Sequence, residues 1–123
     1  MEIVTTDNAP AAIGPYSQAI KSKGFLFASG QIPVIPASGE IDGNSIETQA
    51  ERVMKNVESI LTAAGSDFQH VVKTTCFLAD MNDFAAFNAI YAKYFTGKPA
   101  RSCVAAKELP KGVLCEVELI AEV

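Results

Sequence analysis

The chain is poor in the residues that usually build metal centres or charge-relay sites. It has a single histidine, His70, and three cysteines, Cys76, Cys103 and Cys115, without the close spacing of zinc ligands. An odd number of widely spaced cysteines argues against a disulfide framework and fits a reducing compartment. We therefore expect free thiols, no metal site and no Ser-His-Asp triad, and we interpret His70 as a strand-edge residue.

Positive charge is also scarce. The formal net charge is −4, and no run of five or more Lys or Arg residues occurs. Nucleic-acid-binding proteins usually carry a basic face, so such a partner is not expected. The N-terminus has no basic segment followed by an apolar one, and the apolar stretches are too short for a membrane span. These absences favour a cytoplasmic protein without a membrane partner.

What is present is the composition of an ordinary globular domain. The chain has 123 residues, of which 49% are hydrophobic and 20% are charged, which is enough for one sizeable core. No internal repeat, low-complexity tract or linker interrupts it. We expect a single domain over residues 1–123.

Hydrophobic periodicity predicts an α+β fold with the element order ββαβαββ. Strand-like runs, with an alternating or β-branched pattern, are separated by two stretches with an apolar residue every three or four positions. The predicted strands are residues 16–22, 24–29, 68–78, 101–107 and 113–122, and the predicted helices are residues 46–64 and 81–95. The last two strands are joined by a turn-rich connection that we interpret as a hairpin.

Local signals mark where these elements begin and end. Asn44, with Glu47 three positions later, resembles a capping arrangement for the first helix, and Gly65 supplies a left-handed stop. Residues 8–15 form an arm punctuated by Pro and Gly, and residues 31–44 read as a long ordered loop. Loops of that length are uncommon unless they carry function.

Two helices can cover only one face of a sheet, yet the predicted strands carry apolar residues on both faces, notably through Phe25-Leu26-Phe27 and residues 71–78. We therefore expect a mixed sheet with both helices on one face and the other face buried by symmetric self-association. Clefts between subunits would then be natural binding sites.

The most informative motif is PARSCV at residues 99–104, followed fifteen residues after Arg101 by Glu116. An arginine offers a planar fork of donors for a carboxylate ligand, and a glutamate can position or deprotonate a water molecule. The pair indicates a site for small carboxylates. The alternative is that both are solvated charges, because Glu116, Glu118 and Glu122 share one face of the last strand.

Cys103 shares a strand face with Arg101 and can line the same pocket. A nucleophilic cysteine generally needs an adjacent base, and His70 is the only histidine, so we interpret Cys103 as cleft wall.

Four further residues are weaker candidates for ligand contacts. Tyr16, Ser29 and Gly30 stand at predicted strand ends, where backbone amides and small groups can approach a ligand. Asn88 lies at the margin of the second helix's apolar stripe, where a purely structural role is equally plausible.

Taken in order, six separated motifs resemble the RidA family, also called YjgF/YER057c/UK114. They are NAPAAIGPYSQA at 8–19, SGQIP at 29–33, VKTT at 72–75, NDF at 82–84, PARSCV at 99–104 and EVE at 116–118. The resemblance implies a chorismate-mutase-like fold assembled as a homotrimer with ligand clefts between subunits. It also implies hydrolysis of reactive 2-imino acids, such as 2-iminobutanoate and 2-iminopropanoate, to 2-oxo acids and ammonia, without a metal or organic cofactor.

The resemblance carries site residues over to this chain. These are Tyr16, Ser29, Gly30, Asn88, Arg101, Cys103 and Glu116. It implies that Arg101 binds the substrate carboxylate, that Glu116 holds the attacking water, and that backbone groups at Gly30 and Cys103 help to orient both.

One departure from the family and two alternative functions stay open. Many relatives have a longer segment with an aromatic residue directly before Pro-Ala-Arg, whereas this chain has the short connection at residues 96–98, which could alter the cleft rim and the accepted substrate size. Some relatives are described as endoribonucleases or translation inhibitors, which the acidic charge argues against. A non-catalytic carboxylate binder or a chaperone-like holdase would use the same clefts.

Overall fold

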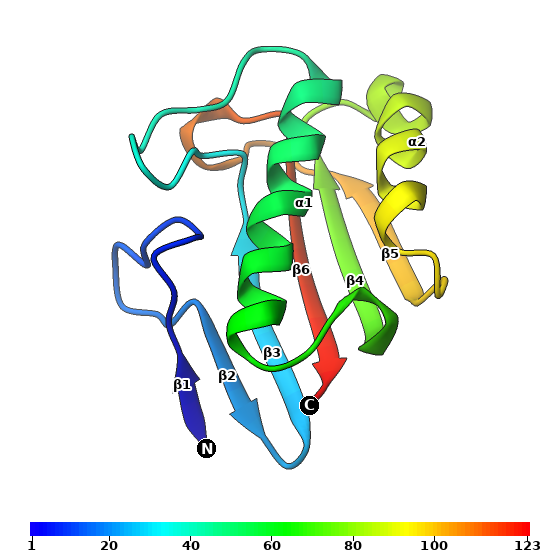
Figure 1. The fold of residues 1–123 in the computed structure, drawn as a ribbon. Helices are drawn as coiled ribbons and strands as arrows, with labels where there is room; N and C mark the ends of the chain where they lie inside the picture. The colour runs from blue at the N-terminus through cyan, green and yellow to red at the C-terminus, as the bar shows by residue number, and fades with distance from the viewer.

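The computed structural model describes residues 1–123 and confirms the α+β class (Figure 1). The elements are β1 (Glu2–Val4), β2 (Ala19–Ser22), β3 (Phe25–Gln31), α1 (Ile46–Ala63), β4 (Val71–Leu78), α2 (Phe84–Tyr94), β5 (Ala100–Ala105) and β6 (Cys115–Glu122). The predicted order ββαβαββ is confirmed, and the short strand β1, which pairs with β2, precedes it.

The six strands form one mixed sheet in the order β1-β2-β3-β6-β4-β5. Strands β4 and β5 are parallel, joined by a crossover through α2, while β6 runs antiparallel to both β3 and β4. The predicted hairpin between the last two strands is therefore wrong. The crossover places β5 outside β4, and β6 fills the antiparallel position between β3 and β4 instead.

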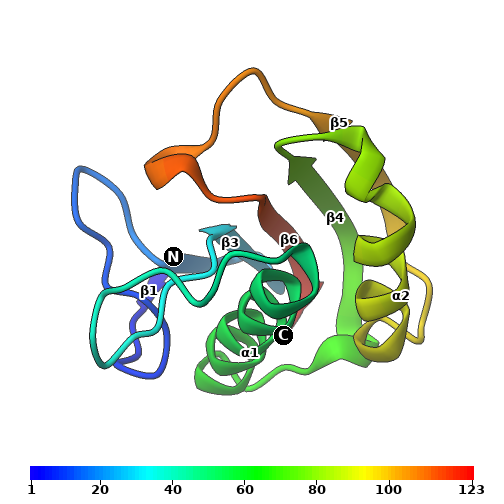
Figure 2. The ribbon, with the colours of Figure 1, turned by 90° about the horizontal axis from the view of Figure 1, so that it is seen from above.

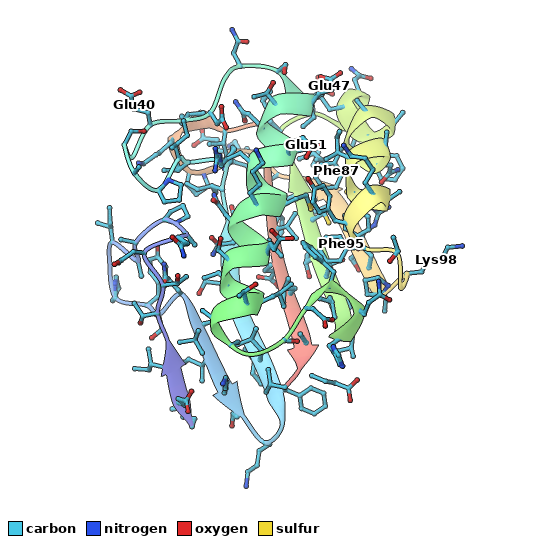
Figure 3. The ribbon with its side chains drawn as sticks, viewed as in Figure 1. Glu40, Glu47, Glu51, Phe87, Phe95 and Lys98 are labelled. Atoms are coloured by element: carbon cyan, nitrogen blue, oxygen red, sulfur yellow. The ribbon has the colours of Figure 1, made fainter.

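Both helices cover the same face of the curved sheet, as the view from above shows (Figure 2). The core lies between them and that face. In Figure 3, Phe87 of α2 and Phe95 just after it lie on the α1 side of α2, and their exposed fractions are 0% and 2%. The inward stripe predicted for this helix is thus confirmed.

The ends of the helices and of β4 differ in detail from the prediction. Ser45, not Asn44, caps α1, because its hydroxyl accepts from the Thr48 N–H at 3.2 Å. Gly65 adopts the expected left-handed conformation with φ of 78°. Residues 68–70 form a 3₁₀ turn rather than strand, and His70 lies in this exposed turn, where its Nδ1 is 2.8 Å from an Asp67 carboxylate oxygen.

The face of the sheet away from the helices leaves large apolar side chains uncovered in the single chain. Phe25, Phe27 and Val104 are 39%, 46% and 48% exposed. The alternation predicted for the last strand is confirmed, since Cys115, Val117, Leu119 and Ala121 are buried on the helix side. In the structure, no helix is long and apolar enough to cross a membrane.

Three buried amide side chains hold the long connections against the core. Gln18 donates to the carbonyls of Thr6, Ala9 and Pro10 and so fixes the N-terminal arm. The Asn56 amide of α1 donates to the carbonyls of Ile32 and Val34, which anchors the loop after β3. Gln49 of α1 accepts from the Leu114 N–H at 2.8 Å, which places the start of β6.

Candidate functional site

Arg101 lies on β5, an outer strand of the sheet, and its side chain is on the helix-covered face beside α2. Its register partner on β4 is Thr74, which is fully buried. Cys103 follows on the same face, opposite Cys76. The predicted sharing of one face by Arg101 and Cys103 is therefore present in the structure.

The Arg101 guanidinium is held by α2. Its Nη1 donates to the Asn88 Oδ1 at 2.7 Å, and its Cζ lies 4.7 Å from the Tyr91 ring centroid and 5.5 Å from that of Phe84. No carboxylate lies within ion-pairing distance, whereas the chain's other arginine, Arg52, pairs with Asp42 at 2.9 Å. Arg101 is thus a half-buried cation without an anionic partner in its own chain.

The guanidinium opens onto a hollow of about 530 Å³. The hollow is lined by residues from α2 and the connection to β5: Asn88, Tyr91, Ala92, Phe95, Thr96, Lys98, Pro99 and Arg101. Lys98, in the short connection predicted to shape the cleft rim, extends away from the molecule in Figure 3. The hollow can therefore admit a small anion against the free donors of Arg101.

Glu116 lies on the opposite, open face of the sheet. It is half-buried, while Glu118 and Glu122 on the same face are exposed, as predicted for those two. A Cβ atom built on Gly30 would lie 2.0 Å from a Glu116 carboxylate oxygen. The carboxylate therefore lies directly against the Gly30 backbone, in space that only glycine leaves free.

Burial raises the pKa of the Glu116 carboxyl above its usual range, and the nearby negative charge of Glu118 raises it further. A raised pKa makes the carboxylate a stronger base at neutral pH than an exposed glutamate. This property suits a group that takes a proton from water.

A second hollow, of about 460 Å³, lies on the side of Glu116 and Gly30. It is lined by Tyr16, Gly30 and Lys111 together with apolar residues of the N-terminal arm and of the loop after β3. Tyr16 is 54% exposed at its mouth. Ser29 does not present a free hydroxyl donor here, because its Oγ donates to the Ser17 carbonyl at 2.6 Å and so fixes the segment that carries Tyr16.

Cys103 has the environment of a structural thiol. Burial raises its pKa, although the positive charge of Arg101 acts in the opposite direction. Its side chain is half-buried and packs against the core, and no histidine lies beside it. A protonated thiol is a poor nucleophile, so this environment argues against covalent catalysis by Cys103. Cys103 is not among the residues that line the hollow beside Arg101, so its role as cleft wall stays a prediction.

The seven predicted site residues thus form two groups within one chain. Arg101, Asn88 and Cys103 lie on the helix side of the sheet near β5, and Glu116, Gly30, Ser29 and Tyr16 lie toward its open face and the N-terminal arm. Along the strands, Glu116 lies three residues from the level of Arg101, and across the sheet it lies two strands away, which is roughly 10 Å in each of these directions. Its side chain is on the other face of the sheet.

The sequence alone did not predict which side chains hold Arg101 in place. Tyr91 was predicted only as part of an apolar stripe, yet its ring faces Arg101 and its hydroxyl bonds to Thr74 at 2.7 Å. The spacing of Phe84, Asn88 and Tyr91 by four and three residues places them on one helix face and could have indicated this. No group of three or more His, Cys, Asp or Glu side chains is arranged to hold a metal ion.

Comparison with known proteins gives concordant matches over nearly the whole chain. The sequence model of the family described as Endoribonuclease L-PSP matches residues 6–123. The "Putative regulator AldR" of Lactococcus lactis is 59% identical, covering 100% of this chain and 98% of that protein. The "Reactive Intermediate Deaminase A, chloroplastic" of Arabidopsis thaliana is 50% identical, covering 98% of this chain and 65% of that protein.

A solved structure agrees with the fold. E. coli TdcF with bound serine has a TM-score of 0.95 and 42% identity, covering 100% of this chain and 99% of that one. The chain therefore belongs to the Endoribonuclease L-PSP family, the RidA (YjgF/YER057c/UK114) family that its motifs indicate.

Proposed function

We propose that this protein hydrolyses small reactive 2-imino acids, such as 2-iminobutanoate and 2-iminopropanoate, to 2-oxo acids and ammonia. The observation that carries the proposal is the Arg101 guanidinium, which is half-buried, faces a hollow and has no carboxylate partner in the chain. A cation held in this way is suited to the carboxylate that all 2-imino acids share.

Two relatives support this substrate class. The Arabidopsis relative is named a reactive intermediate deaminase, and the E. coli relative TdcF is described with bound serine. Serine has the same carboxylate next to a nitrogen-bearing carbon as a 2-imino acid. A site that accepts serine can therefore accept an imine of similar size.

In the proposed reaction, Arg101 binds the substrate carboxylate and Glu116 takes a proton from water as the water oxygen bonds to the imine carbon. The substrate is the protonated imine, so the C=N electron pair moves to nitrogen and leaves a neutral amino group. Glu116 then returns its proton to that group, the C–N bond breaks and ammonia leaves, and the hydroxyl proton passes to solvent water, which gives the 2-oxo acid. Water is the only co-reactant.

Arg101 and Glu116 lie on opposite faces of the sheet in one chain, so we propose that neighbouring copies in a homotrimer complete each site. The open face with Phe25, Phe27 and Val104 would be buried by this association. Each cleft would then combine the Arg101 group of one copy with the Glu116 group of the next.

Mixed assemblies test this arrangement. Arg101→Ala and Glu116→Gln chains, each inactive alone, are co-expressed with different tags and the doubly tagged oligomers are isolated. If each cleft draws the two residues from neighbouring copies of a trimer, about one cleft in three of a doubly tagged trimer keeps both intact residues. Activity near that fraction is expected, whereas none would show that both residues must come from one chain.

The activity itself is tested by following imine decay, with the imine generated in situ by a pyridoxal-phosphate-dependent dehydratase. Arg101→Ala at wild-type rate would refute the carboxylate clamp. Glu116→Gln separates an enzyme from a non-catalytic binder or a holdase. Retained serine binding with lost turnover supports catalysis, and unchanged turnover refutes the role of the glutamate.

The description of the matching family makes ribonuclease activity the second candidate. The net charge of −4 is unfavourable for binding a phosphate backbone. RNA cleavage that survives purification and disappears in Glu116→Gln would establish it.

A further inference from the structure

We infer that Tyr91 is a positioning residue whose ring holds the Arg101 guanidinium in the orientation that receives a carboxylate. The inference rests on the clamp role proposed above for Arg101. It adds to that role the part of the fold that keeps this side chain in place.

Three side chains of α2 contact the guanidinium from one face of the helix. The Tyr91 ring is nearer than that of Phe84, at 4.7 Å against 5.5 Å, and Asn88 accepts the hydrogen bond from Nη1 at 2.7 Å. A guanidinium within about 6 Å of an aromatic centroid is attracted by the ring's electron density. Tyr91 therefore has the closer of the two aromatic contacts.

The Tyr91 ring is itself fixed by a hydrogen bond at its hydroxyl and by stacking on its face. Its hydroxyl and the Thr74 Oγ1 are 2.7 Å apart, and Thr74 is fully buried. The Phe95 ring stacks on it with a centroid distance of 4.4 Å, and Tyr91 is only 8% exposed. Thr74 is also the register partner of Arg101 in the sheet. The hydroxyl bond thus ties the ring to the strand position beside the arginine.

This form of support leaves the clamp free to bind. A carboxylate partner in the chain would neutralise Arg101 and occupy its fork of donors, as Asp42 does at the Nε of Arg52. An aromatic ring attracts the cation without accepting its in-plane N–H groups. Within the chain, the Arg101 guanidinium donates a single side-chain hydrogen bond, from Nη1 to Asn88, so its other N–H groups can bind a carboxylate.

The two arginines of the chain allow a direct spectroscopic test. In the full-length protein labelled with ¹⁵N-arginine, Arg52 and Arg101 give two Nε–Hε resonances, and the ion-paired Arg52 serves as an internal reference. Serine is titrated as the carboxylate probe. We expect serine to move the Arg101 resonance and to leave that of Arg52 in place.

Variants of Tyr91 then separate its contributions. Tyr91→Leu should shift the free Arg101 resonance, because the ring is lost, and should weaken serine binding about tenfold, the size of a partly desolvated cation–π contact. Tyr91→Phe keeps the ring and should weaken binding by less than about threefold. In the deamination assay, Tyr91→Leu should raise KM for the imine with little change in kcat.

Tyr94→Leu is the matched control. It removes a second tyrosine of α2 that also bonds a partner, Glu51, and lies near a cation, the Lys93 Nζ at 5.9 Å. It does not contact Arg101, so serine affinity should stay at the wild-type value. Equal weakening by both variants would mean a general effect on α2 and would overturn the inference.

The failures of the two proposals are distinguishable. If serine does not move the Arg101 resonance of the wild-type protein, the clamp is refuted and the role of Tyr91 falls with it. If serine binds Tyr91→Leu with wild-type affinity, the clamp stands and only the role of Tyr91 is refuted. Should Tyr91→Leu fail to fold, Thr74→Val decides: it releases the ring from the strand, so an Arg101 resonance that stays at its wild-type position overturns the inference.

Discussion

Replacing Gly30 by alanine should strongly reduce kcat while leaving the fold intact. The new Cβ would lie 2.0 Å from a Glu116 carboxylate oxygen and 2.8 Å from the carboxylate carbon, whereas ordinary contact begins at 3.4 Å. The oxygen must therefore retreat by 3.4 − 2.0, or about 1.4 Å. A misplacement of about 1 Å can reduce catalysis on the order of 100-fold, so kcat for imine hydrolysis should fall by about that factor.

The fold should tolerate this change. Gly30 does not have a positive φ, so alanine brings no backbone strain, and the atoms in its way are the movable end of a side chain. Urea unfolding should give a free energy within about 1 kcal/mol of the wild type. Gly97→Ala is the matched control, because Gly97 also lacks a positive φ and its nearest atom, the Gln69 Oε1, is 3.4 Å away.

Two results would refute the reasoning. One is wild-type kcat in Gly30→Ala, which would mean that the position of the Glu116 carboxylate does not limit the reaction. The other is a further loss when Gly30→Ala is added to Glu116→Gln, because an effect that acts through the carboxylate cannot persist without it.

Three further predictions concern charge and capping. Because burial and then Glu118 raise the pKa of Glu116 in the free protein, the acid limb of the kcat/KM profile should lie above the range of ordinary carboxyls. Glu118→Gln should move this limb to lower pH, and an unmoved limb argues against Glu116 as base. Hydrogen bonds from Lys93 and then Tyr94 lower the pKa of Glu51 in the folded protein, so the stability that its carboxylate adds is present above the unfolded-state pKa and is lost as pH falls through the folded-state pKa. In thermal unfolding, Glu51→Gln should therefore destabilise the protein at pH 7 but not at a pH below the folded-state pKa. Equal destabilisation at the two pH values would refute this role of Glu51. Ser45→Ala should reduce the free energy of unfolding by about 1 kcal/mol, whereas Asn44→Ala should change it much less.

The parts of the fold that depend on local pattern were predictable. Alternation along β6 separates buried Val117 from half-buried Glu116, and the apolar spacing of α1 identifies its inner face. These periodicities follow from the geometry of a single element. The same reasoning placed Arg101 and Cys103 correctly on one face of their strand.

What depends on long-range arrangement was not predictable from pattern. The turn-rich connection before β6 resembles a hairpin locally, but β4 lies between the two strands that it joins. Ser45 and Asn44 are both good caps by type, and only the backbone geometry chooses between them. The separation of Arg101 from Glu116 on two faces, and the bond from Tyr91 to Thr74, follow from strand order and helix placement.

The lack of an internal acid beside Arg101 also affects how the protein should be handled. A guanidinium with free donors binds whatever small carboxylate the solution contains. Acetate, citrate and formate buffers should therefore compete with substrate and raise the melting temperature. Kinetic constants for this protein are best measured in a zwitterionic buffer, and a thermal-shift screen of small carboxylates would give a first ranking of ligands before any reactive imine is made.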